Sequence, residues 1–146
     1  MQVFLTIITG VLVFVVSQLL LKLVIEPVQQ LKRVISNISF ALILYANVWP
    51  VAGLPLEEDK EIEKIYNEFN KLASLLNASR DLIPIYHQIK KIFYLPTAKE
   101  ISSAKSALIG LSNIILKSPN GKRGDSSDRR YGYEKEIRDA INIQEY

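Results

Sequence analysis

The sequence predicts an all-α fold, in which an N-terminal transmembrane helix is followed by a small antiparallel helical bundle. The first 25 residues carry a single charged side chain, Lys22, whereas the remainder is rich in charged residues. Apolar residues recur at helical spacing along much of the later chain, and no alternating strand pattern of useful length is present. The expected organisation is a transmembrane anchor over 1–26, a helical domain over 27–117, a flexible linker over 118–132 and a short helix or tail over 133–146.

Residues 3–25 are expected to cross a lipid bilayer. At about 1.5 Å per residue, a helix of this length covers the roughly 30 Å hydrocarbon layer. A helix also satisfies its own backbone polar groups, as the bilayer interior requires. A secretory signal peptide would begin with positive charge and end in a small-residue cleavage site. This segment has neither feature, and a buried core helix so apolar on every face would need a larger protein around it.

The flanking charges predict the orientation of this span. Basic residues follow it and none precedes it, so the positive-inside rule places the N-terminus outside and the C-terminal domain in the cytoplasm. The side chains expected at the membrane interface are Lys22, Lys32, Arg33 and Trp49. The small or polar residues suited to helix–helix contact within the span are Thr6, Gly10, Ser17 and Gln18.

Residues 34–56 are also free of charge and allow two interpretations. A second span would move the downstream domain to the opposite side of the membrane. Against it, polar side chains such as Asn37 and Asn47 are costly in hydrocarbon, and prolines interrupt its last third. Its apolar residues share one helical face, which favours a partly buried amphipathic helix, and we therefore expect one span. That face comprises Ile35, Ile38, Leu42, Tyr45 and Trp49.

Proline positions and capping signals divide the predicted domain into helices. The first follows Pro27 and ends near residue 48, and the second begins after Pro55 with an acidic first turn. A short third helix follows Pro84 and ends near residues 95–96. Thr97 and Glu100 have the spacing of a capping box, which predicts the start of a fourth helix that ends near residue 117. Within that fourth helix, Gly110 is a candidate for close packing against a neighbour.

The residues that carry chemistry are sparse, so no catalytic, cofactor or metal site is expected. The absence of cysteine excludes disulfides and thiolate metal sites, and His87 is the single histidine. Acidic residues 57–63 match no calcium-loop spacing, and Lys90 and Lys91 are more typical of a solvated helix face than of lipid contact. Acidic residues interrupt the basic pairs of the tail, so no nucleic-acid partner is expected.

Three sequence runs resemble a family of small bacterial membrane proteins of unknown function. They are EPVQQLKRVISNISFALILYANV, KLASLLNASRDLIPIY and LPTAKEISSAKSALIGLSN, and the similarity covers residues 18–117. The resemblance implies an N-terminal span followed by helices, in the inner membrane of a bacterium. It implies no activity, ligand or catalytic residue.

A single anchor, a patterned bundle and the lack of chemistry predict a non-catalytic interaction or scaffold module held at the membrane. Besides the lipid bilayer, its expected partner is a second copy of the chain or another membrane protein. The alternative hypothesis is a membrane-acting effector, whose oligomerised spans perturb the bilayer in response to a cytoplasmic signal.

Overall fold

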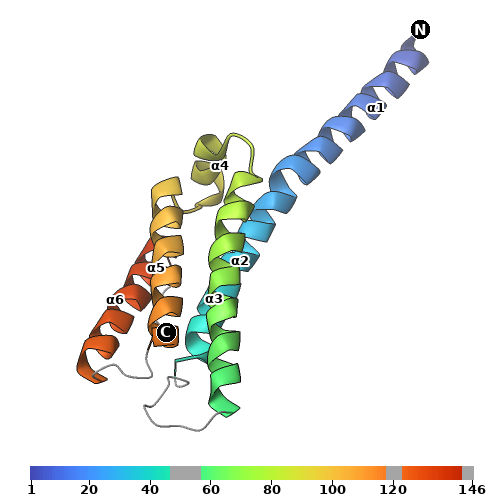
Figure 1. The fold of residues 1–146 in the computed structure, drawn as a ribbon. Coiled ribbons are helices and arrows are strands. Elements are labelled where there is room, and N and C mark those ends of the chain that lie inside the picture. Colours follow the sequence, from blue (N-terminus) through green and yellow to red (C-terminus); the bar gives the residue numbers. More distant parts are fainter. Residues whose placement is uncertain (47–56, 118–122, 143–146) are drawn as a thin grey trace.

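The computed structural model describes residues 1–46, 57–117 and 123–142. Within these ranges the regular elements are all helical, which confirms the all-α prediction. They are α1 (Gln2–Leu20), the π-helical turn η1 (Leu21–Ile25), α2 (Glu26–Leu44), α3 (Glu57–Asp81), α4 (Tyr86–Phe93), α5 (Ala98–Lys117) and α6 (Arg123–Ile141). In Figure 1, α1 extends away from a bundle formed by α2, α3, α5 and α6.

The α1, η1 and α2 segments form one continuous helix of 43 residues. A proline inside an α-helix removes one backbone hydrogen bond and its ring clashes with the carbonyl four residues earlier. Here the turn ahead of Pro27 is widened, and the Glu26 N–H bonds to the carbonyl of Leu21, five residues back. Such a π-type turn gives the proline ring room, so the chain passes from α1 into α2 without a break.

The bundle core is formed by one face of each long helix. In sequence order, α2 packs on α3, α3 on α5 and α5 on α6, while α2 and α6 meet at few points. The chain direction alternates between successive helices of this series, so the predicted antiparallel bundle is confirmed (Figure 1). Its largest fully buried apolar side chains are Phe69, Leu31, Ile38, Ile65, Leu76, Ile101, Leu108, Leu111, Ile115 and Ile137.

The position of α2 favours the prediction of one span for residues up to Ala46. Its inward face, which includes Val34, Ile38 and Leu42, is buried in the bundle, whereas the outward residues include Ser36 and Asn37. Such a helix is amphipathic, as expected, and it belongs to the domain core. The helix ends at Leu44 rather than near residue 48, and Trp49 lies outside the described residues, together with the proline-containing stretch that follows.

The starts of α3, α4 and α5 agree closely with the sequence signals. The Thr97 N–H donates to Oε2 of Glu100 at 2.5 Å, and the Glu100 N–H donates to Oγ1 of Thr97 at 3.2 Å. This reciprocal pair is the predicted capping box, and it satisfies two backbone donors at the start of α5. Helix α4 begins at Tyr86, just after Pro84, and α3 begins at Glu57, after Pro55.

The prediction of a flexible linker over 118–132 is wrong for residues 123–132, because α6 begins at Arg123 rather than near residue 133. The first half of α6 is polar and has little apolar periodicity, so its sequence pattern does not indicate a helix. A contact distant in sequence helps to hold it, because the Arg130 side chain donates to the Ala46 carbonyl at 2.7 Å. Within the helix, Arg130 also pairs with Glu134, four residues later, at 2.6 Å. The helix therefore belongs to the bundle and is not a tail beyond it.

Gly110 gives α5 its close approach to α6, as the sequence suggested. A Cβ placed there would lie 2.6 Å from Cζ of Tyr133, inside the ring's contact distance. We expect Gly110→Ala to destabilise the protein, because overpacking typically costs about 1–3 kcal/mol while the gain in helix propensity is about 1 kcal/mol. In a Tyr133→Ala background the same change should stabilise the protein. Urea denaturation of the full chain in detergent measures the free energy of unfolding in both backgrounds. If Gly110→Ala changed it equally in the two, the contact between Gly110 and the Tyr133 ring would be refuted.

Ser79 is a buried polar residue whose hydroxyl has no hydrogen-bond partner among the described residues. Burying an unsatisfied hydroxyl costs about 1–3 kcal/mol, so we expect Ser79→Ala to raise the free energy of unfolding by about 1 kcal/mol. The matched control is Ser112→Ala, because Ser112 is equally buried but donates to the Ile109 carbonyl at 2.8 Å. A gain at Ser112 as large as at Ser79 would contradict this explanation.

Tyr94 ends α4 in a left-handed conformation that glycine usually occupies. Its φ is 53°, its side chain is 93% exposed, and the N–H groups of Tyr94 and Leu95 both bond to the Lys90 carbonyl. Because left-handed backbone costs an L-residue about 1–2 kcal/mol, Tyr94→Gly should stabilise the protein by about 1 kcal/mol. Tyr131→Gly, at an exposed tyrosine inside α6, should instead destabilise it by a similar amount. A loss of stability in the Tyr94 variant would show that the side chain is needed for folding.

Candidate functional site

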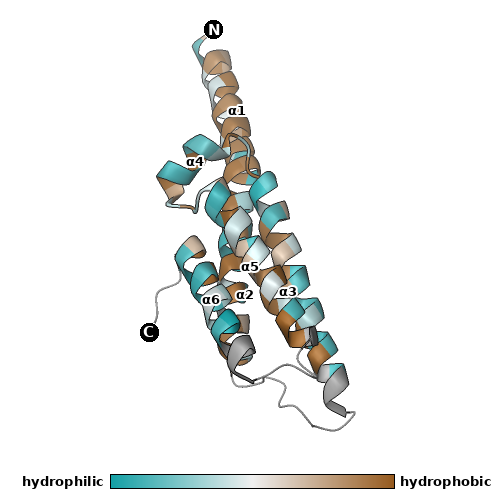
Figure 2. Ribbon diagram, turned by 60° about the vertical axis from the view of Figure 1, so that its left-hand side comes forward, coloured by the Kyte–Doolittle hydropathy of each residue, from teal (hydrophilic) through white to brown (hydrophobic). Residues whose placement is uncertain are grey.

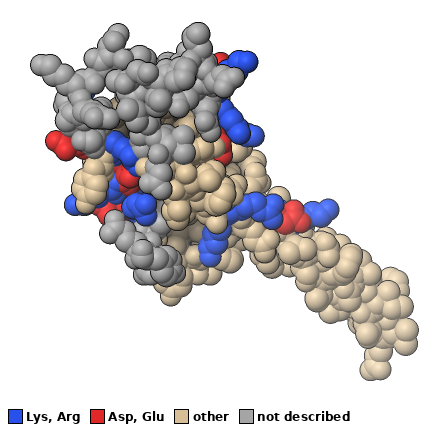
Figure 3. Space-filling model, turned by 90° about the horizontal axis from the view of Figure 1, so that it is seen from below, with Lys and Arg blue, Asp and Glu red and all other residues tan. Residues whose placement is uncertain are grey.

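Helix α1 is the part of the chain that differs most from a globular protein. None of its residues is buried, although most are large and apolar. In Figure 2 the ribbon of α1 carries mostly the colour of hydrophobic residues, and Figure 3 shows that charged side chains begin only at its base. Among the described residues, the continuous helix Gln2–Leu44 contains the one stretch that is long and apolar enough to cross a membrane.

The polar groups inside α1 are satisfied within the helix itself. The hydroxyls of Thr6, Thr9 and Ser17 each donate to the carbonyl four residues earlier, at 2.7–3.0 Å. This is the bonding expected of serine and threonine in an apolar environment, where no water competes for the hydroxyl. The three side chains therefore do not disturb the apolar surface of α1.

The four residues predicted for helix–helix contact divide into two groups. Thr6, Gly10 and Ser17 lie on one face, because their spacing brings them within about 40° of each other at roughly 100° per residue. Gln18 lies about 100° further round the same helix. Apart from the neighbouring residues and nearby backbone of α1 itself, no described atom lies within 4 Å of a Cβ placed at Gly10, so no other described element packs against the helix at this point.

The predicted interface residues lie at different heights along the helix. Lys22 is exposed in η1, at the end of the uncharged stretch, where its ammonium can reach the headgroups. Lys32 and Arg33 are exposed on α2, about 15 Å further along the axis at 1.5 Å per residue. The three residues therefore do not form a single ring at one membrane depth, and Lys22 is the one nearest to the apolar helix.

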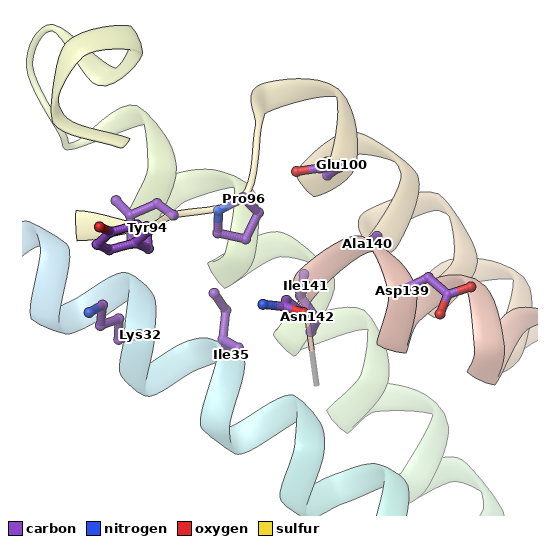
Figure 4. Close-up of a pocket in the computed structure, with 10 residues that line it drawn as sticks. Lys32, Ile35, Tyr94, Pro96, Glu100, Asp139, Ala140, Ile141 and Asn142 are labelled. Carbon is purple, nitrogen blue, oxygen red and sulfur yellow. The ribbon is translucent and has the colours of Figure 1, made fainter. Parts of the chain in front are cut away.

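A pocket of about 420 Å³ lies where α2 and α6 separate beneath the α4–α5 connection (Figure 4). Its charged groups are few and separated: Lys32 and Asp139 lie at opposite sides, and Glu100 is engaged in the capping box. Tyr94 covers the end near α2. Because these groups do not converge on one point, the pocket has no arrangement suited to catalysis.

A second pocket, of about 370 Å³, lies between the end of α3 and α4. It contains Arg80, His87 and Lys90, but Arg80 already pairs with Asp81 at 2.5 Å, and His87 is exposed. The described residues contain no group of three or more side chains that could hold a metal ion. We find no acid–base pair or nucleophile with an activating partner in this pocket.

Tyr86 lines this second pocket and ties α4 to the start of α5. Its hydroxyl donates to the Pro96 carbonyl at 2.6 Å. Burial raises the pKa of Tyr86 to about 12, and the nearby Arg80 guanidinium only partly opposes that effect. The phenol therefore stays neutral at physiological pH and serves as a hydrogen-bond donor rather than a base.

Sequence reasoning missed the exposed apolar residues around α4. Of Ile85, Ile89 and Ile92, which lie in or beside this short helix, only Ile89 is buried. Ile85 precedes the helix in a left-handed conformation with φ 51°, and Ile92 points outward beside the core. The pattern of an eight-residue helix does not distinguish a buried face from an exposed one, so no sequence signal separates these residues.

Comparison with protein-family models, with curated proteins and with solved structures finds no match to this chain. The resemblance to small bacterial membrane proteins therefore stays a prediction.

Proposed function

We propose that the chain is a membrane-anchored helical interaction or scaffold module with no catalytic activity. One observation carries the proposal: α1 is uncharged and mostly apolar and has no buried residue, while the bundle has a core of its own. Exposing such a helix to water is costly at about 25 cal/mol per Å² of apolar surface, whereas a bilayer removes that cost.

The proposed setting is the inner membrane of a bacterium, with the N-terminus outside and the bundle in the cytoplasm. The charges that follow α1, of which Lys22 is the first, support this orientation. The proposed partner is a second copy of the chain or another membrane protein. Within the bundle, the outer face of α2 supports this proposal, because Phe40, Ile43 and Leu44 are 63%, 64% and 49% exposed.

The mass of the full chain in lipid nanodiscs tests the self-association part of this proposal. A defined dimer or higher oligomer would support it, and replacement of Phe40 and Ile43 by serine should then reduce that species. A strictly monomeric chain would refute self-association. In that case, chemical crosslinking in intact membranes should recover one defined protein at constant stoichiometry, and the absence of any crosslinked species would contradict the scaffold role itself.

The alternative hypothesis, a membrane-acting effector, stays a prediction from the sequence. Membrane potential after induced expression separates it from the scaffold module. A scaffold leaves the potential unchanged, whereas an effector collapses it.

A further inference from the structure

Four exposed apolar side chains lie on α4 or in the turns beside it. Leu82, Ile85, Ile92 and Tyr94 are 56%, 68%, 71% and 93% exposed. They all lie within residues 82–94, which comprise α4 and its flanking turns. A globular protein exposes single apolar residues at many places, but four within thirteen residues, on one short helix and its flanking turns, indicate a contact surface.

The backbone conformation at two of these residues indicates that their side chains have a functional role. Ile85 and Tyr94 have φ values of 51° and 53°, in the left-handed region that favours glycine. For a β-branched residue such as Ile85, this conformation is a true outlier. Glycine would relieve the strain, and little buried surface would be lost because both side chains are mostly exposed. Strain that brings folding no benefit is typical of residues retained for binding.

The location of α4 indicates what the surface contacts. In Figures 1 and 2, α4 lies beside the junction of α1 and α2, at the end of the bundle from which α1 emerges. If α1 crosses a bilayer, as the proposed function states, that bilayer lies against this same end. The four apolar side chains are then close to the membrane surface, where tyrosine and isoleucine are favourable.

The charges at this end of the bundle fit an anionic surface. Lys90 and Lys91 lie in the last turn of α4, and Lys22 lies at the end of the apolar helix. Of the acidic residues nearby, Asp81 pairs with Arg80, Glu100 accepts from the Thr97 N–H, and Glu26 is exposed beside Lys22. These lysines place positive charge at the end of the bundle from which α1 emerges, where it can attract anionic lipid headgroups.

We propose that α4 and its flanking turns lie on the bilayer surface, with Ile85, Ile92 and Tyr94 in the interfacial layer and Lys90 and Lys91 against anionic headgroups. This inference rests on the proposed membrane anchor. It gives the bundle a second attachment to the membrane, which fixes its orientation relative to α1. The outer face of the bundle then presents a defined surface to a partner.

Because the chain has no cysteine, single cysteines carrying an environment-sensitive fluorophore can test this contact. The full chain is reconstituted into vesicles of phosphatidylcholine and phosphatidylglycerol that contain quencher-labelled lipids. Ile92→Cys reports α4, Val13→Cys reports α1, and Asn113→Cys, exposed towards the other end of α5, is the negative control. We expect shallow quenchers to act on residue 92, deep quenchers on residue 13, and neither on residue 113.

The outcomes separate the two proposals. Quenching at residue 13 without quenching at residue 92 would overturn the surface contact and leave the anchor intact. Loss of quenching at residue 13 would overturn the anchor itself, and the surface contact with it. With the anchor in place, Lys90→Glu/Lys91→Glu should abolish quenching at residue 92. The matched change Lys64→Glu/Lys71→Glu on exposed positions of α3 should leave it unchanged. Equal effects of the two double variants would contradict the role of the α4 lysines.

Discussion

Two arginines in the middle of α1, Leu12→Arg/Val16→Arg, are expected to release the chain from the membrane fraction. Each arginine at the centre of a span costs about 3–4 kcal/mol relative to an aliphatic residue on insertion scales, so the pair costs roughly 6–8 kcal/mol. Neither side chain touches the bundle, since both are more than half exposed and α1 has no buried residue. The fold of the domain should therefore persist while insertion fails.

The measurement is the fraction of the full chain that resists extraction from membranes at alkaline pH. The control, Gln29→Arg/Gln30→Arg, adds the same charge at two exposed positions of α2 and should leave that fraction unchanged. If the α1 variant remained in the membrane to the same extent as the control, α1 would not be the segment that holds the chain there.

Of all the substitutions proposed within the bundle, Phe69→Ala is expected to lower the free energy of unfolding the most. The Phe69 side chain is 1% exposed, and its ring packs edge-on against Tyr45 with a centroid distance of 5.9 Å. Removing a buried phenylalanine costs about 3–5 kcal/mol, because it loses both transfer free energy and packing. A domain with about 5–15 kcal/mol of stability would lose a large part of it.

Phe40→Ala is the matched control for this truncation, because it removes the same atoms from a residue that is 63% exposed on α2. Its effect on the free energy of unfolding should stay below about 1 kcal/mol. Urea denaturation of the full chain in detergent, followed by circular dichroism, measures both variants. Similar losses in the two would contradict the placement of Phe69 of α3 in the core and of Phe40 on the outward face of α2.

Much of the fold could be predicted from the sequence because the signals are local. The regular apolar spacing of α3, the prolines at positions 55 and 84, and the Thr97–Glu100 capping box each act within a few residues. The apolar stretch of α1 needs no tertiary information either, because its composition alone sets its preference for lipid. These elements are the ones whose bounds agree best with the structure.

The parts that could not be predicted depend on contacts between distant residues. Helix α6 has glycine, serine and aspartate in its first half, and it is held by contacts such as Arg130 with the Ala46 carbonyl, 84 residues away in sequence. The exposure of Ile85, Ile92 and Tyr94 depends on how α4 is seated against α5, which an eight-residue pattern does not encode. The apolar surface of α4 is therefore apparent only in three dimensions.

The central claim is that α1 crosses the membrane once and that the bundle lies on one side of it. Chemical labelling of two single-cysteine variants tests this claim most directly. Gln2→Cys reports the N-terminus and Ser106→Cys reports an exposed position on α5. A maleimide that cannot cross the inner membrane should label Gln2→Cys in intact cells, and Ser106→Cys only after the membrane is disrupted. Labelling of both positions from the same side would contradict a single span, and the inverse pattern would contradict the proposed orientation.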